Sequence, residues 1–118
     1  MSKQITKQEL SSLLETDHSQ IVLLDVREPS EYTSSDFPSI HSSAHNIPIN
    51  TLKEAFHLDE HEFKNKYGFE KPKTDATIVC YCKLGGRAQK ATDALAELGY
   101  HDVRCYKGSA SEWWSNQA

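Results

Sequence analysis

Short apolar runs, separated by polar and glycine-containing stretches, set the pattern of this chain. The longest is Ile21-Val22-Leu23-Leu24, in a segment that continues to Val26 and is interrupted only by Asp25. Such a run, with several β-branched residues, is typical of a strand buried on both faces, as in a parallel sheet. Strands are predicted over residues 21–26, 44–47, 77–82 and 103–106.

Helices are predicted between these strands by capping signals and by helical spacing. Thr6 and Glu9 have the spacing of a capping box and open a helix over residues 7–14. From residue 87 to 98, alanines and leucines recur at helical intervals, and Gly99 follows as a typical C-terminal cap. Further helices are predicted over 50–56 with Asn50 as cap, from Asp59 onward, and from Ser109 onward. Strands that alternate with helices predict an α/β sandwich around a mostly parallel sheet.

Composition limits the kinds of function that this chain can have. Its 118 residues suit one compact domain over residues 1–118, and no repeat or linker divides them. Thirteen basic and 17 acidic residues give a net charge of -4, which argues against general affinity for nucleic acid or for an anionic membrane. The longest apolar run is far too short to span a bilayer, so no membrane partner is expected.

Cysteine content and the N-terminal residues bear on the compartment. Three cysteines form an odd set, and a chain of this size can fold without disulfides. We therefore expect a reducing compartment, the cytosol, in which thiols stay available for chemistry. Residues 1–5 lack the apolar core of a secretory signal and the Arg-rich pattern of a transit peptide. A mitochondrial protein is the alternative if a transit peptide has been lost from the sequence.

The candidate nucleophile, Cys82, lies at the end of the third predicted strand. Five candidate substrate-binding residues follow it: Lys83, Leu84, Gly85, Gly86 and Arg87. The carboxyl end of a strand is where open α/β sheets bind ligands. Both glycines can adopt backbone angles that are closed to other residues, so the loop can curl and turn its N–H groups toward one point.

This environment favours a thiolate on Cys82 over the neutral thiol. The inward N–H groups, the helix N-terminus, Lys83 and Arg87 all stabilise negative charge. Arg87 can also hold an oxyanion through paired donors. A thiolate surrounded by donors suits attack on a dianionic substrate that contains sulfur. The alternative is that Cys82 is an ordinary buried thiol of the core.

Four motifs, in order along the chain, resemble the rhodanese domain. They are Asp-Val-Arg-Glu-Pro-Ser-Glu-Tyr at 25–32, Asn-Ile-Pro at 46–48, Cys82-x-x-Gly85-x-Arg87, and the tail from Gly99 to Trp113. Residues 63–69 are similar to small eukaryotic single-domain members, some of them described as thiosulfate sulfurtransferases. The resemblance covers nearly the whole chain. It implies a three-layer sandwich, in which helices cover both faces of a central, mostly parallel sheet of about five strands.

The resemblance implies a two-step sulfur transfer with Cys82 as nucleophile. Its thiolate attacks the outer sulfur of thiosulfate, sulfite leaves, and a persulfide remains on Cys82. An acceptor such as cyanide, glutathione or a protein thiol such as thioredoxin then removes the sulfur. In the family, Asp25 and Arg27 are mainly structural and support the site through salt bridges. We expect a monomer that uses no cofactor and no metal.

Two other functions stay open at this point. A persulfide carrier or binding module would use the same loop and take its sulfur from a partner protein. Related phosphatases have a loop that is one residue longer, whereas four residues separate Cys82 from Arg87 here. Tyr81 also stands where cysteine phosphatases usually have histidine.

The other cysteines and one divergent segment allow more than one interpretation. Cys80 shares a strand face with Cys82 and either resolves its persulfide or packs in the core, as Cys105 is expected to do. A zinc site at Cys80 and Cys82 would fit no known ligand spacing well. Residues 39–44 depart from the family's Gly-His-Ile-Pro-Gly-Ala and suggest an altered loop, lengthened by residues 36–38, with consequences for the acceptor.

Histidines and tryptophans near the loop are the remaining candidates. His41 and His45 either line the pocket or lie at the surface. Trp113 and Trp114 are adjacent on a predicted helix, so both cannot face inward equally. One of them is expected to pack on the sheet and the other to cover the site or meet a partner.

Overall fold

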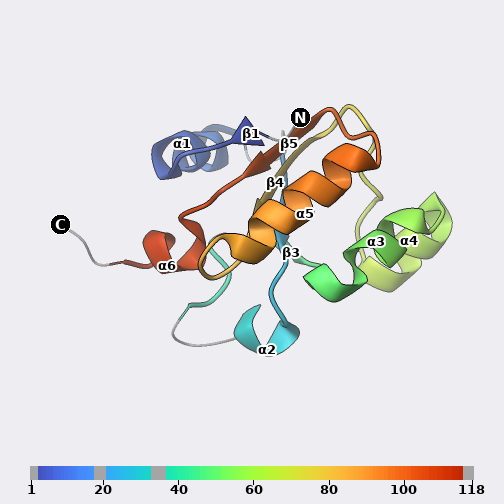
Figure 1. Cartoon of the computed structure of the whole chain (residues 1–118), viewed down its shortest axis with the longest axis horizontal. Coiled ribbons are helices and arrows are strands. Elements are labelled where there is room, and N and C mark those ends of the chain that lie inside the picture. Colours follow the sequence, from blue (N-terminus) through green and yellow to red (C-terminus); the bar gives the residue numbers. More distant parts are fainter. Residues whose placement is uncertain (1–2, 18–20, 33–36, 116–118) are drawn as a thin grey trace.

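A parallel β-sheet lies at the centre of the molecule (Figure 1). The computed structural model describes residues 3–17, 21–32 and 37–115. The strands in this part of the chain are β1 (Lys3–Gln4), β2 (Ile21–Asp25), β3 (His45–Asn46), β4 (Thr77–Tyr81) and β5 (Asp102–Cys105). They form one five-stranded sheet in the order β1-β5-β4-β2-β3, and neighbouring strands are parallel. The predicted α/β class and the parallel sheet are confirmed.

The edge strand β1 was not expected from the apolar pattern. Its two residues are polar and exposed, and they pair with Arg104 and Cys105 of β5. The opposite edge strand, β3, is shorter than the predicted strand over 44–47. Edge strands in this fold bury few side chains, so a pattern of apolar residues marks them weakly.

Helices cover both faces of the sheet, as predicted. They are α1 (Lys7–Asp17), α2 (Pro29–Tyr32), the 3-10 helix η2 (Ile49–Thr51), α3 (Leu52–His57), α4 (Glu60–Tyr67), α5 (Gly86–Glu97) and α6 (Ser109–Trp113). Alternate residues of β4 point in opposite directions, so Ile78 and Cys80 lie in the core beneath α3, α4 and α5, and Val79 and Tyr81 in the core beneath α1 and α6. Among the described residues, none of the helices has the length and apolar composition that a transmembrane segment needs.

Three of the predicted helix signals are confirmed at atomic detail. The Thr6 N–H donates to Glu9 Oε1 at 2.9 Å, and the Glu9 N–H donates to Thr6 Oγ1 at 3.1 Å, which completes the capping box. At α4, Asp59 Oδ1 accepts the Glu62 N–H at 2.8 Å. Gly99 follows α5 with a left-handed φ of 98°, as expected of a residue that ends a helix.

Two predicted caps are wrong. Asn50 lies inside η2, and Thr51 occupies the N-cap position of α3 without a side-chain capping bond. Ser109 is the first residue of α6, and Gly108 is its N-cap. The Ser109 side chain is used by a long-range contact instead, which local sequence signals do not reveal.

The core beneath α5 offers a test of this packing. Leu95 is fully buried there, whereas Glu97 on the same helix is exposed. Leu95→Ala leaves a cavity, so we expect it to lower the free energy of unfolding in urea by about 2–5 kcal/mol. The control Glu97→Ala is expected to change that free energy by less than about 0.5 kcal/mol. Equal effects of the two substitutions would contradict the packing of α5.

Candidate active site

The loop from Cys82 to Arg87 connects the carboxyl end of β4 to the N-terminus of α5. Gly85 is the N-cap of α5 and has a left-handed φ of 105°. A Cβ atom at this position would also collide with the carbonyl group of Lys107, so glycine is required twice over. Gly86 is different, because it begins the helix with no positive φ and with open space around its Cα. The expectation that both glycines take unusual backbone angles therefore holds for Gly85 alone.

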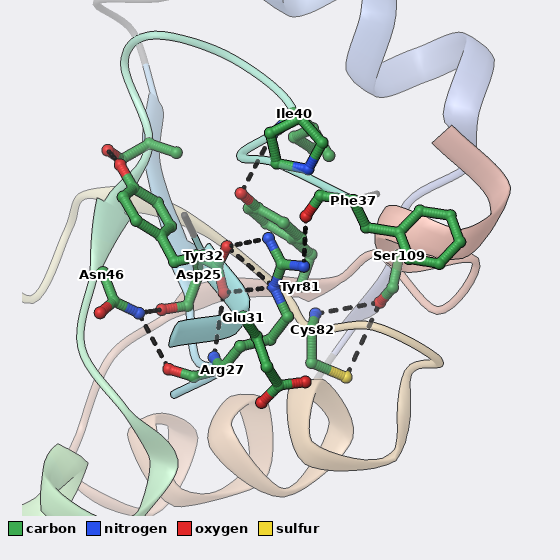
Figure 2. Close-up of polar contacts among 12 residues, drawn as sticks. Asp25, Arg27, Glu31, Tyr32, Phe37, Ile40, Asn46, Tyr81, Cys82 and Ser109 are labelled. Carbon is green, nitrogen blue, oxygen red and sulfur yellow. Dashed lines mark hydrogen bonds and ion pairs between the residues drawn. The ribbon is translucent and has the colours of Figure 1, made fainter. Parts of the chain in front are cut away.

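Cys82 is enclosed by hydrogen bonds at its side chain and at its backbone (Figure 2). Its Sγ accepts the Gly85 N–H at 3.0 Å, and only 1% of the residue is exposed. Its own N–H donates to Ser109 Oγ at 3.1 Å, and its carbonyl accepts the Ala110 N–H at 2.9 Å. One loop N–H therefore already points at the sulfur atom.

Ser109 was missed as a site residue, since its sequence signal is that of a helix cap. Its Oγ accepts the Cys82 N–H, donates to the Tyr106 carbonyl at 2.8 Å and lies 3.9 Å from Cys82 Sγ. The residue is fully buried and has a φ of 57°, a strained angle for a residue other than glycine. The hydrogen bonds of its side chain with Cys82 and Tyr106 stabilise this strained backbone conformation. Two sequence signals could have drawn attention to it: it follows a glycine shortly after a predicted strand, and it lies in the tail motif of residues 99–113.

The N-terminus of α5 adds further donors beside the thiol. The first hydrogen bond of the helix runs from the Gln89 N–H to the Gly85 carbonyl at 3.0 Å. The N–H groups of Gly86, Arg87 and Ala88 precede it, so they have no acceptor within the helix. Together with the helix dipole, they favour an anion at this end of the helix.

Arg87 is bound by a residue that was not predicted to belong to the site. Its Nη1 and Nη2 donate to the two carboxylate oxygens of Glu31, in α2, at 2.6 and 3.0 Å. The hydrogen bonds from Arg87 lower the pKa of Glu31 to about 2. The same pairing is the first cause of the raised pKa of Arg87, and interaction with Cys82 contributes to it. Glu31 lies in the 25–32 motif, but nothing in its local sequence identifies its distant partner.

Lys83 and Leu84 form the exposed tip of the loop. The Lys83 Nζ lies 5.5 Å from the centroid of the Phe37 ring, a cation–π distance. Leu84 is 73% exposed, which is unusual for a large apolar side chain. The structure therefore brings the predicted residues 82–87 together around one point, with Lys83 and Leu84 at its outer edge.

Asp25 and Arg27 form a buried ion pair behind the loop (Figure 2). Arg27 Nη2 donates to Asp25 Oδ2 at 2.7 Å, and both side chains are almost fully buried. The Arg27 Nη1 donates to the Phe37 carbonyl at 2.6 Å, and the guanidinium lies 5.7 Å from the Tyr81 ring centroid. Asn46 Nδ2 donates to the carbonyls of both Asp25 and Arg27 at 2.9 Å. The pair thus fixes the chain around the end of β2.

Cys80 and Cys105 are packed in the core. Both are fully buried and are register partners on β4 and β5. Burial raises the pKa of Cys80 to about 12 and also raises that of Cys105, so both stay neutral thiols near neutral pH. No group of three or more metal-ligating side chains occurs in the described residues.

The divergent segment packs against the sheet through Tyr81. The Ile40 N–H donates to the Tyr81 hydroxyl at 3.2 Å, and His41 Nδ1 lies 2.8 Å from Ser43 Oγ. Residue 36, which was expected to lengthen this loop, lies outside the described residues. His45 stacks on Phe69 at 3.7 Å between ring centroids, and burial lowers its pKa.

Of the two tryptophans, Trp113 is the more buried. Its ring lies 6.1 Å from that of Tyr106 in an edge-on contact. Trp114 is 42% exposed and donates from Nε1 to the Pro38 carbonyl at 2.8 Å. It joins α6 to the segment beside the loop.

Comparison with known proteins gives consistent matches over most of the chain. A family model of the rhodanese-like domain matches residues 6–116. The thiosulfate:glutathione sulfurtransferase of Saccharomyces cerevisiae is 35% identical over 96 residues, 81% of this chain and 66% of that protein. The mitochondrial thiosulfate sulfurtransferase RDL2 of the same yeast is 33% identical over 108 residues, 92% of this chain and 70% of that protein. This chain therefore spans about two thirds of the length of these two yeast relatives.

A solved structure extends the likeness to the whole fold. The human single-domain sulfurtransferase TSTD1 matches with a TM-score of 0.86 and 31% sequence identity. The match covers 98% of this chain and 97% of the human one.

The contrast between the two loop glycines can be tested directly. Gly85→Ala places a Cβ at a left-handed φ and against the Lys107 carbonyl, so we expect the free energy of unfolding to fall by about 1–3 kcal/mol or more. Gly86→Ala meets neither obstacle and is expected to leave the stability unchanged or slightly raised. Urea unfolding measures both. A harmless Gly85→Ala would contradict the loop geometry described above.

The Glu31–Arg87 ion pair makes stability depend on pH. The pKa of Glu31 falls from 4.5 to about 2 in the folded protein, so its contribution is complete above about pH 4.5 and is lost as the pH falls toward 2. We expect Glu31→Gln to be less stable than the wild type near neutral pH, and the difference in unfolding free energy to shrink as the pH falls through that range. Glu28→Gln, at an exposed neighbouring carboxylate, is the control. A difference that did not vary with pH would rule out the ion pair as its source.

Proposed function

This chain belongs to the rhodanese-like domain family, and we propose that it is a sulfurtransferase that moves a sulfane sulfur from thiosulfate to an acceptor through a persulfide on Cys82. The observation that carries the proposal is the contact between Cys82 Sγ and the Gly85 N–H at the end of β4. It combines the nucleophile with a donor in a loop that ends at a helix N-terminus.

The first step is a displacement at sulfur. The Cys82 thiolate attacks the outer sulfur of thiosulfate and forms a new S–S bond. The original S–S bond breaks, and its electron pair leaves with sulfite, so that an anionic persulfide remains on Cys82. Negative charge is conserved but moves from one sulfur to another, and the N–H groups around the loop are suited to stabilise it along this path.

The second step returns the enzyme to its starting state. An acceptor thiolate attacks the outer sulfur of the persulfide, and the Cys82 thiolate leaves with the electron pair of the cleaved bond. The name of one yeast relative, the thiosulfate:glutathione sulfurtransferase, supports glutathione as this acceptor. Because Cys82 is only 1% exposed, the enclosed site favours reactants whose sulfur projects from a small group.

The residues around Cys82 divide this work. Lys83 and Arg87 bind the anionic donor together with the backbone of Leu84, Gly85 and Gly86. Arg87 keeps donors for this role, since a guanidinium has five N–H groups and Glu31 accepts from two of its nitrogens. Asp25 and Arg27 support the site from behind, through their ion pair and the contact with Phe37.

The proposed setting is a monomer without cofactor in a reducing compartment, the cytosol. The three cysteines are free thiols, as such a compartment requires. The mitochondrion is the alternative, and the name of RDL2 gives it support.

Sulfite release from thiosulfate tests the proposal. We expect the wild type to release sulfite in the presence of glutathione, cyanide or thioredoxin, and Cys82→Ser to release none above background, because the nucleophile is gone. Cys80→Ala is the matched control and should keep the activity, since Cys80 is a core thiol. Equal rates for wild type and Cys82→Ser would overturn the proposal.

The same proteins distinguish the two rival functions. A Cys82 persulfide that mass spectrometry detects only when a partner desulfurase is supplied would identify a carrier. Hydrolysis of an aryl phosphate without sulfite release would identify a phosphatase.

A further inference from the structure

Glu31 places a negative charge at the edge of a site whose proposed donor is a dianion. Its carboxylate oxygens lie 2.6 and 3.0 Å from Nη1 and Nη2 of Arg87, and about a third of each side chain is exposed. This parallel, two-point geometry is the strongest form of ion pair between these groups. Sequence motifs explain the presence of Arg87 in the loop, but they give no reason for a carboxylate against it.

The pair changes the field that a reactant meets. A lone guanidinium attracts an anion over several ångströms. An ion pair of a guanidinium and a carboxylate has a net charge near zero, so its attraction for an anion decreases over a shorter distance. Arg87 belongs to the Cys82 loop and interacts electrostatically with Cys82, so the charge of its partner Glu31 bears on any anion that approaches the thiol. Lys83, at the loop tip, is the cation of the loop that stands outside this ion pair.

We propose that Glu31 is a specificity-determining residue, which neutralises Arg87 and so limits the attraction of the Cys82 site for anionic reactants. The inference rests on the proposed sulfur transfer for its biological meaning. In that reaction one dianion, thiosulfate, enters and another, sulfite, leaves. A site with less positive charge holds the donor less tightly, but it also releases sulfite and admits a less anionic acceptor more readily.

Alkylation of Cys82 measures this charge without requiring sulfur transfer. Iodoacetate is anionic and iodoacetamide is neutral, so the ratio of their rates at Cys82 reports the local potential. Fragment-ion sequencing by mass spectrometry assigns the label to Cys82 and distinguishes it from Cys80, which lies two residues away, and from Cys105. The ratio is compared in the wild type, Glu31→Gln, Glu31→Asp and Glu28→Gln.

We expect Glu31→Gln to raise the iodoacetate-to-iodoacetamide ratio about three- to tenfold, and the increase to diminish at high salt. Glu31→Asp keeps the charge and should stay near the wild-type ratio, as should the control Glu28→Gln. Lys83→Gln should lower the ratio. For sulfur transfer, Glu31→Gln should lower the KM for thiosulfate without raising kcat.

A double substitution separates charge from structural damage. Glu31→Gln with Arg87→Gln removes both charges, so the alkylation ratio should return close to that of the wild type. Damage to the loop would not be repaired by a second substitution. Any of three results would overturn the inference. The first is an alkylation ratio that is equal in all single variants, and the second is a failure of both reagents to react with Cys82 in every variant. The third is a ratio in the double variant that stays as high as in Glu31→Gln. Absence of sulfite release in a wild type whose ratio responds as expected would reject the sulfurtransferase proposal and leave the charge assignment of Glu31 intact.

Discussion

The backbone N–H and the backbone carbonyl of Cys82 are both hydrogen-bonded by the chain that follows β5, and the geometry of the site depends on these contacts. Ser109 Oγ accepts its N–H, and the Ala110 N–H donates to its carbonyl. One residue further on, the Ser111 N–H donates to the Lys83 carbonyl at 3.0 Å. The start of the loop is thereby fixed to α6, and the remaining residues have little freedom before α5 begins. A nucleophile must be positioned within a fraction of an ångström, and here backbone hydrogen bonds do the positioning.

Cys80 and Cys82 show how strongly the environment of a thiol changes at the end of a strand. Cys80 and Cys82 are separated by a single residue and contribute to the same core. Cys80 is fully buried in that core, and burial raises its pKa to about 12. At Cys82 the strand has ended, and the sulfur meets an N–H group from the loop. The same residue type is therefore inert at one position and suited to chemistry two positions later.

Much of this architecture could be predicted, because burial leaves a clear pattern in sequence. The central strands β2 and β4 are apolar on both faces, and the capping box at Thr6 marks α1 through local bonds. The loop 82–87 was located by its cysteine, glycines and cations. Ser109 and Glu31 could not be found in this way, since each acts on a residue far along the chain. The same limit explains the polar strand β1, which exists only because β5 lies beside it.

The hydrogen bonds that Ser109 and Ala110 form with the backbone of Cys82 determine when the active site can form during synthesis of the chain. Ser109 follows Cys82 by 27 residues, so the nucleophile leaves the ribosome before the groups that position it. A nascent chain that ends before β5 already contains the thiol and α5. It lacks the hydrogen-bond partners of the Cys82 backbone and the carbonyl of Lys107 that lies against Gly85. The site is completed only when β5 pairs with β4 and Ser109 takes its left-handed angle. A translation product or proteolytic fragment that stops short of Ser109 therefore carries a cysteine without an active centre.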